Sequence, residues 1–365
     1  MILGWEKHIS KKIQPGKTYY RHIPSLLTQW EFPTVSEEIP PRALRWVANS
    51  CYLDSILFAF FAANNFVESL INTNLDEQKD QIVKEGICGK DSTTDIVNRT
   101  AVQKELKSIF KSITRKGPEV EFCTNLRKTL KNCPVEEKYH TGNTGDSGEF
   151  MEYLLNIFST KKLTKKTITY ATNKKGLIID KEKLIREGKL IKISEKYDYK
   201  GSIIIPIVED IVAQIPKHGV KLSKFLTEED DMFVHETIDK KSFKRRIQIK
   251  TIEDAPYLIF NVKRLVSENP RQFISYPFYP DEYILVGKDK FFTLSGVVMH
   301  TGGCHYVAVA KYGNVWYYYN DIDYLHTKKL IPFKNFNEFV ENATKYPKSF
   351  INPLTHGTQY FYKLL

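Results

Sequence analysis

The feature that most constrains the fold is an apolar segment that begins directly after NSCYLDS, residues 49–55. This segment, ILFAFFAANNF, contains neither glycine nor proline and is too long for a single strand. We therefore predict a buried helix over residues 52–72, which needs a large core around it. A chain of 365 residues with 42% hydrophobic residues can supply such a core.

Helix-forming and strand-forming patterns occupy different parts of the chain. Further helices are expected near 98–114, near 120–131 and from residue 146 or 147 onward. From about residue 166, runs rich in β-branched and aromatic residues alternate with turn residues, which predicts strands. This segregation indicates an α+β architecture. The cleft between the two halves is the natural place for an active site.

Residues 1–44 differ from the rest of the chain. Prolines at positions 15, 24, 33, 40 and 41 favour an extended lead-in with little regular structure. The first residues, MILGWEKHISKKIQ, carry charges where a signal peptide needs an apolar core, so we do not expect secretion. No apolar stretch approaches the roughly 18 residues of a transmembrane helix, so we expect no membrane partner.

The cysteines argue against a disulfide framework. They are odd in number, contain no CxxC pair and are widely spaced, which fits a reducing, intracellular compartment. They also cannot build a zinc site of the paired-cysteine kind, and we expect neither a metal nor a cofactor. The five are Cys51, Cys88, Cys123, Cys133 and Cys304.

Much of the formal net charge of +11 lies in a lysine-rich segment, residues 161–200. Such a segment could attract nucleic acid or an acidic partner. Arginines and aromatic residues suited to base contact are not concentrated there, however. A solvated insertion is the interpretation that the composition favours over nucleic-acid binding.

Cys51 stands at the head of the predicted buried helix, with Ser50 as its cap. Unpaired N–H groups and the helix dipole favour an anion at that end, so we expect a stabilised thiolate. A thiolate nucleophile needs a nearby imidazole as proton carrier. Taken alone, a cysteine beside an apolar run is more simply a core residue.

A second motif, GGCHYVAVAKYGNVWYYYND, covers residues 302–321. His305 opens a strand, and a Tyr-Gly-Asn turn leads into a second, aromatic strand. A hairpin of this length brings its ends together, which places Asn320 or Asp321 beside the imidazole to hold its tautomer. Together, Cys51, His305 and Asn320 or Asp321 favour nucleophilic catalysis over separate structural roles.

Five segments resemble the ubiquitin-specific proteases in that family's order. NSCYLDSILFAFF resembles the cysteine box, most closely that of the cylindromatosis-type branch, and GGCHYVAVAKYGNVWYYYND resembles the histidine box. GDSGEFMEYLLNIF is similar to the acidic box, APYLIFNVKRL to the strand that usually ends in Leu-Lys-Arg-Phe, and TQYFYKLL to the closing strand. The resemblance runs from about residue 42 to residue 365.

The resemblance implies a papain-like fold with a helical thumb, a β-rich palm and fingers, here without zinc ligands. It implies an N-terminal extension over 1–41 and a catalytic domain over 42–365, with 162–250 as the fingers. The implied activity is hydrolysis of the bond after the C-terminal Gly-Gly of ubiquitin. Cys51 becomes the nucleophile, His305 the general base and Asn320 the third residue, with Asp321 as its alternative.

The resemblance also assigns substrate-binding positions. Asp146 and Glu149 match the acidic box that grips the arginine-bearing ubiquitin tail, where a carboxylate can bind guanidinium. Capping of the following helix is a second role for Asp146. Gly303 and Tyr306, on either side of the histidine, are expected at the tail channel.

Two positions depart from the family pattern. The usual oxyanion Asn lies five residues before the cysteine, where this chain has Trp46. Asn49 is the remaining side-chain candidate for an oxyanion donor, together with the Cys51 N–H. Cys304 replaces the usual Gly before the histidine.

Ubiquitin and ubiquitinated proteins are thus the expected partners, and the oligomeric state stays unassigned. Three alternatives remain open: a ubiquitin-binding scaffold without turnover, a peptidase for another ubiquitin-like modifier, and a nucleic-acid-binding module.

Overall fold

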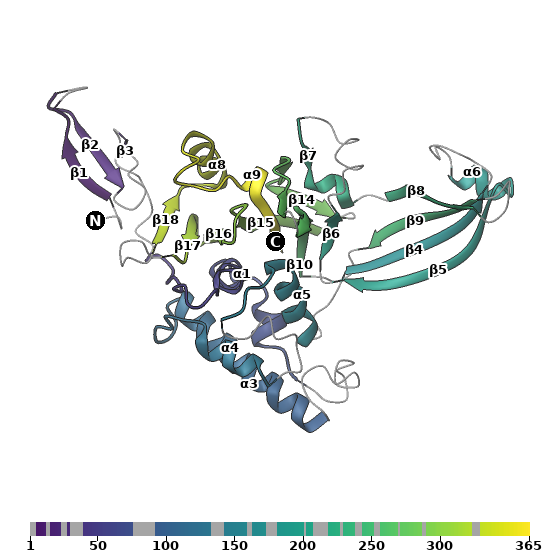
Figure 1. Ribbon diagram of the computed structural model, residues 1–365, viewed down its shortest axis with the longest axis horizontal. Helices are drawn as coiled ribbons and strands as arrows, with labels where there is room; N and C mark the ends of the chain where they lie inside the picture. Colours follow the sequence, from purple (N-terminus) through teal and green to yellow (C-terminus); the bar gives the residue numbers. More distant parts are fainter. Residues whose placement is uncertain are drawn as a thin grey trace.

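The computed structural model shows a central body from which two sheets project on opposite sides (Figure 1). It describes residues 5–11, 15–22, 28–29, 39–75, 92–132, 142–158, 163–172, 181–200, 202–206, 218–226, 229–237, 243–251, 256–268, 271–286, 290–322 and 329–365. Cys88 and Cys133 lie outside these ranges.

Helix α1, Cys51–Ala62, lies at the centre of the body, and all of its residues are buried. It is shorter than the predicted 52–72 helix. The chain reverses after Ala62, where Asn64 and Phe66 adopt left-handed backbone angles, and a π-helical turn, η1 Val67–Ile71, follows. Asparagine tolerates this conformation well, and the reversal packs Phe66 against the rings of Phe60 and Tyr257.

A helical layer covers one side of α1. It consists of α3, Ser92–Ile113, α4, Thr124–Leu130, and α5, Ser147–Ile157. These are the helices predicted near 98–114, near 120–131 and from residue 146 or 147, with shifted ends for the first two. None of the helices described is long and apolar enough to cross a bilayer.

An eight-stranded sheet, the palm, packs against the other side of α1. Its order is β18-β17-β16-β15-β19-β10-β6, with β14 paired to β15. Both faces are apolar: Ala308 and Ala310 of β16 join the cluster around α1, while Val307 and Val309 join a second cluster on the far face. The strands are β6 Ile203–Pro206, β10 Tyr257–Lys263, β14 Tyr283–Val286, β15 Lys290–His300, β16 Tyr306–Tyr312, β17 Val315–Asn320, β18 Lys329–Phe333 and β19 Gly357–Leu364.

Two short helices complete the far face of the palm. Helix α8, Phe336–Lys345, begins at the N-cap Asn335, whose side chain accepts from the Glu338 N–H at 2.8 Å. Phe339 of α8 packs against Tyr318 of the sheet. Helix α9, Pro353–His356, leads directly into β19.

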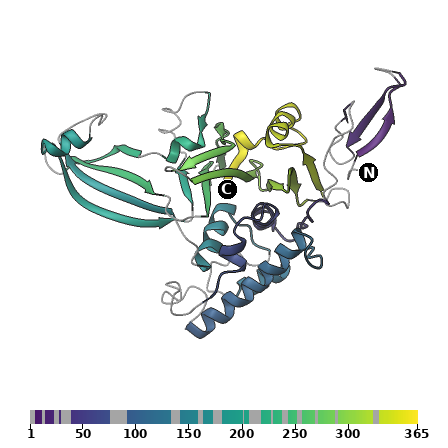
Figure 2. The ribbon, with the colours of Figure 1, turned by 180° about the vertical axis from the view of Figure 1, so that it is seen from behind.

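The fingers are a four-stranded sheet that extends away from the body, as both ribbon views show (Figures 1 and 2). Its order is β5-β4-β9-β8, with α6, Lys181–Arg186, between β4 and β5. The strands are β4 Leu163–Thr172, β5 Leu190–Lys200, β8 Glu229–Thr237 and β9 Phe243–Thr251.

The predicted finger segment 162–250 is therefore not one insertion. Between β5 and β8 the chain returns to the body, where β6 pairs in parallel with β10. Strand β7, Val220–Lys221, pairs with β13, Phe278–Tyr279, and the 3-10 helix η3, Leu222–Leu226, follows it. Apolar residues of this excursion, such as Ile203 and Leu222, are buried in the second core cluster.

The N-terminal region also departs from expectation. Instead of an irregular lead-in, it contains a sheet of β1 Trp5–Ile9, β2 Thr18–His22 and β3 Thr28–Gln29. Gly16, with φ of 82°, lies in the turn between β1 and β2, a conformation that glycine adopts readily.

Arg264, directly after β10, is buried and holds four backbone carbonyls. Its Nε donates to Gly357 O at 2.7 Å and its Nη2 to Leu354 O at 3.0 Å. Its Nη1 donates to Ile274 O at 3.0 Å and to Tyr276 O at 2.8 Å. The guanidinium thus ties the end of β10 to the start of β19 and to a short hairpin, β11 Leu265–Glu268 with β12 Arg271–Phe273.

Replacing Arg264 tests this clamp. We expect Arg264→Met to lower the free energy of unfolding by about 3 kcal/mol or more, because four carbonyls lose their donor. Urea denaturation gives the value. Lys263→Met is the matched control: its side chain is 41% exposed, so the loss should stay below about 1 kcal/mol. Equal losses in the two variants would show that Arg264 is not a clamp.

Candidate active site

Cys51 begins α1 at the junction of the helical layer and the palm. Its Sγ lies 3.8 Å from the carbonyl oxygen of Cys304. Ser50 occupies the N-cap position, but its hydroxyl does not cap the first turn as predicted. It accepts from the Val47 N–H at 2.9 Å and donates to Asp54.

The loop that leads into α1 is held from both halves of the body. The Trp46 N–H donates to the carbonyl of Asp321 at 3.0 Å, at the end of β17. From the helical side, the Arg127 guanidinium donates to the carbonyls of Val47 and Ala48 at 3.2 and 2.6 Å. These contacts fix the backbone immediately before the thiol.

His305 lies directly before β16, and the predicted hairpin is present: β16 and β17 pair antiparallel. Its Nε2 lies 2.9 Å from Asn320 Oδ1. The same oxygen accepts from the Ile322 N–H at 3.1 Å, which identifies it as the carbonyl end of the amide. Because that oxygen can only accept, Nε2 carries the proton, and Nδ1 is left as the basic nitrogen.

Asp321 lies behind this pair. Its Oδ1 is 3.5 Å from His305 Nε2, and its side chain is fully buried. Both candidates for the third position therefore stand next to the imidazole. Asn320 makes the hydrogen bond, and Asp321 supplies a buried carboxyl at slightly longer range.

The electrostatics of Cys51 differ from the expected stabilised thiolate. Burial raises the pKa of the thiol to about 12, and a negative charge on Asp321 acts in the same direction whenever that carboxyl is ionised. Backbone N–H groups of Tyr306 and Tyr52 act in the opposite direction but do not offset burial. The pKa of His305 is lowered by burial, partly offset by the hydrogen bond to Asn320. At rest, the site therefore holds a neutral thiol beside a neutral imidazole.

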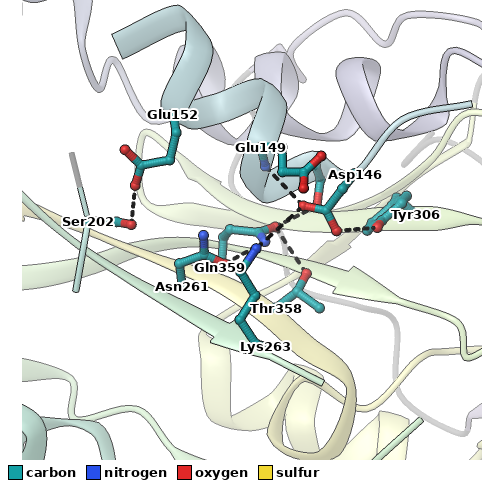
Figure 3. Close-up of polar contacts among 10 residues, drawn as sticks. Asp146, Glu149, Glu152, Ser202, Asn261, Lys263, Tyr306, Thr358 and Gln359 are labelled. Atoms are coloured by element: carbon teal, nitrogen blue, oxygen red, sulfur yellow. Dashed lines mark hydrogen bonds and ion pairs between the residues drawn. The ribbon is translucent and has the colours of Figure 1, made fainter. Parts of the chain in front are cut away.

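Asp146 caps the following helix, which is one of the two roles expected of it. It is the N-cap of α5, and its Oδ1 accepts from the Glu149 N–H at 2.9 Å. Its Oδ2 accepts from the Tyr306 hydroxyl at 3.3 Å, and Lys263 Nζ lies 4.0 Å from Oδ1 (Figure 3). The Asp146 side chain remains 35% exposed, so a ligand can still reach it.

Polar side chains join α5 to the palm beside Asp146 (Figure 3). Gln359 Oε1 accepts from Ser147 Oγ at 2.8 Å, and Gln359 Nε2 donates to Asn261 Oδ1 at 3.2 Å. A Cβ on Gly148 would lie 2.8 Å from Asn261 Nδ2, so glycine lets the helix approach this closely. The first turn of α5 is thereby positioned on β10 and β19.

The sequence matches the family model described as ubiquitin carboxyl-terminal hydrolase over residues 43–331. The chain belongs to the ubiquitin carboxyl-terminal hydrolase family. A search of curated proteins gave no match. The family assignment confirms the resemblance drawn from the sequence motifs, while the cylindromatosis-type branch stays a prediction.

Solved structures with this fold include the SAGA DUB module of Ubp8, Sgf11, Sus1 and Sgf73. In its complex with monoubiquitin the similar chain has a TM-score of 0.54 and 11% identity, over 95% of this chain and 79% of that one. In its complex with ubiquitin aldehyde the values are 0.54 and 13%, over 92% and 72%. The likeness confirms the predicted papain-like α+β fold.

The remaining predicted positions of this ubiquitin carboxyl-terminal hydrolase lie around the same junction. Asn49, with φ of 62°, donates from Nδ2 to the carbonyl of Gly142 at 2.9 Å. Glu149, Gly303 and Cys304 are exposed, whereas Tyr306 is buried. Among the residues described, no group of three or more His, Cys, Asp or Glu could hold a metal ion.

Sequence reasoning missed three residues beneath the site: Asp54, Cys123 and Arg127. Asp54 and Arg127 are fully buried, and Cys123 lies against Asp54. A charged residue inside an otherwise apolar helix was the available signal for Asp54. The sequence carries no comparable signal for Arg127 and Cys123, because their position beneath the site depends on how α4 packs.

Alkylation kinetics test whether His305 activates the thiol. In a Cys304→Ser background, which removes the one thiol that is exposed among the described residues, His305→Ala should slow iodoacetamide labelling of Cys51 by about 10²-fold between roughly pH 6 and 9. The reason is that a thiol with a raised pKa needs a proton acceptor. Mass spectrometry locates and quantifies the label. Unchanged labelling would mean that Cys51 ionises without the imidazole.

Proposed function

We propose that this protein is a thiol deubiquitinase that cleaves the bond after the C-terminal Gly-Gly of ubiquitin. The observation that carries the proposal is the convergence of Cys51 and the His305–Asn320 pair at the junction of thumb and palm, in a chain of this family. The similar Ubp8 structures hold monoubiquitin or ubiquitin aldehyde, which supports ubiquitin as the substrate here.

The neutral resting pair defines the chemistry. When substrate excludes water, the Cys51 thiol gives its proton to His305 Nδ1, and the sulfur attacks the carbonyl carbon of the terminal glycine. His305 then protonates the leaving amine, and a thioester on Cys51 remains. Water, deprotonated by His305, attacks the thioester and releases the carboxylate and the thiol.

The oxyanion of each tetrahedral intermediate needs donors. Trp46 has no side-chain amide to offer, and its backbone N–H is already used by Asp321. We assign the oxyanion to the Cys51 N–H and to Asn49, whose amide has a second hydrogen besides the one given to Gly142. The left-handed conformations of Ala48 and Asn49 shape this turn.

The tail-binding role falls to the first turn of α5, where Asp146 and Glu149 present carboxylates near Tyr306. A ubiquitin tail that carries arginines suits such a surface. Gly303, exposed before the histidine, borders the same approach to Cys51. In this scheme residues 42–365 form the catalytic domain. Its substrates are ubiquitinated proteins inside the cell.

A ubiquitin probe with a C-terminal electrophile tests the substrate and the nucleophile together. We expect one adduct on Cys51, seen by mass spectrometry, that is absent in Cys51→Ala and retained in Cys304→Ser. Binding of ubiquitin without an adduct would favour the second candidate function, a ubiquitin-binding scaffold without turnover. The raised pKa of the Cys51 thiol and Trp46 at the usual oxyanion position are the observations that favour this candidate. An adduct with another modifier alone would overturn the substrate assignment.

Asp146→Asn separates tail binding from helix capping, because asparagine caps as well as aspartate. We expect KM for a ubiquitin substrate to rise about tenfold or more, through loss of a charge-assisted contact, with kcat little changed. The unfolding free energy should stay near that of the wild type. Asp146→Ala, the control, should also lose about 1 kcal/mol of stability. An unaltered KM in both would exclude tail binding.

A further inference from the structure

Two carboxyl groups meet in the core directly behind His305. Asp54 comes from the first turn of α1 and is fully buried, and Asp321 comes from the end of β17 and is 3% exposed. Their side chains are direct neighbours in the core, and the charge of Asp54 raises the pKa of Asp321. The pair therefore spans the same junction of helical layer and palm as the reactive residues above it.

Two ionised carboxylates cannot hydrogen-bond, because both are acceptors only. In the described part of the chain, Asp54 Oδ1 and both oxygens of Asp321 find no donor. The nearby Ile322 N–H donates to Asn320 at 3.1 Å. A proton between the two groups would satisfy one oxygen of each and remove the repulsion of two buried like charges.

We propose that Asp54 and Asp321 share one proton, carried by Asp321 and donated to Asp54, and that this pair is a positioning unit beneath Cys51 and His305. The donors around each group decide where the proton sits. Asp54 accepts from the Ser50 hydroxyl, and the neighbouring Cys123 thiol also favours its carboxylate form by lowering its pKa. The backbone N–H groups of Asp321 and Ile322 act in the same direction on Asp321, but no side-chain donor among the described residues bonds to its carboxyl oxygens.

The charges around the pair agree with a single proton. The groups facing it are Cys51 of α1, Cys123 and Arg127 at α4, His305 before β16, and Tyr319 of β17. Arg127 is the permanent cation in this set, and it hydrogen-bonds backbone carbonyls. One carboxylate facing one guanidinium is a balanced buried cluster, whereas two would leave an uncompensated charge. Burial, followed by the Asp54 charge, raises the pKa of Asp321 well above its usual value.

The shared proton affects the reaction through Cys51. A charged Asp321 raises the pKa of the Cys51 thiol, so a neutral Asp321 makes transfer of the thiol proton to His305 easier. The carboxyl group also packs at 3.5 Å from His305 Nε2 without competing for the hydrogen bond to Asn320. This consequence rests on the proposed thiol function, whereas the shared proton itself does not.

Infrared spectroscopy tests the proton directly. We expect the wild-type protein at neutral pH to show the C=O stretching band of a buried carboxylic acid. Asp54→Asn and Asp321→Asn should each abolish it, because either change leaves a single carboxylate beside Arg127. Asp281→Asn is the matched control, because the Asp281 carboxylate lies outside the site and accepts from Lys221 Nζ and the Ser223 N–H. The carboxylic acid band should persist in this variant.

Each other outcome contradicts the proposal. A band that survives Asp54→Asn would mean that burial alone protonates Asp321, and no band in the wild type would mean two carboxylates. If a variant fails to fold, a pH titration of the wild-type protein still tests the proposal. The carboxylic acid band must then fade as the pH rises and the shared proton leaves. Asp54→Asn should also alter the pH profile of Cys51 alkylation, not merely its amplitude. Because the band needs no substrate, a failed ubiquitin reaction and a failed proton assignment remain distinguishable.

Discussion

Helix α1 is enclosed on all sides because the helical layer and the palm both close on it. Phe58 stacks on Tyr319 of the palm with ring centroids 4.4 Å apart, and Phe61 meets Phe110 of α3 at 5.6 Å. Each such ring contributes about 1.5–3 kcal/mol through burial. The start of α1 cannot shift without disturbing both layers, so every group on its first turn inherits this burial, Cys51 and Asp54 included.

That burial determines the electrostatics of the site. A helix N-terminus stabilises an anion by about 0.3–2 kcal/mol. A rise of the thiol pKa from 9.0 to about 12 corresponds to roughly 4 kcal/mol against the thiolate. Desolvation therefore outweighs the dipole, and the thiol becomes a nucleophile only when its proton has an acceptor. In the proposed mechanism that acceptor is His305, and the same enclosure couples the two carboxyls of the proposed pair behind it.

Sequence patterns predicted the features that depend on residues close together in the chain. The β16–β17 hairpin follows from alternating apolar residues around a Tyr-Gly-Asn turn, so the approach of Asn320 to His305 could be predicted. The end of α1 at Ala62 could not, because tertiary packing of Phe66 favours the reversal. The N-terminal sheet and the return of β6 to the palm depend on pairing between distant segments. The thiol pKa was misjudged because a sequence shows a helix start but not how deeply it is buried.

The reactive geometry belongs to the interface of the two halves and to neither half alone. Cys51 and Asp54 come from the helical side, whereas His305, Asn320 and Asp321 come from the palm. Several hydrogen bonds cross this interface next to them: Trp46 to Asp321, Tyr319 to Leu44 at 3.2 Å, and Ser147 to Gln359. Each contributes about 1 kcal/mol, and one sliding motion would break all of them together. The fold thus holds Cys51 and His305 in place cooperatively, and Asp146, placed on α5 and bonded to Tyr306 of β16, ties the proposed tail-binding position to the same interface.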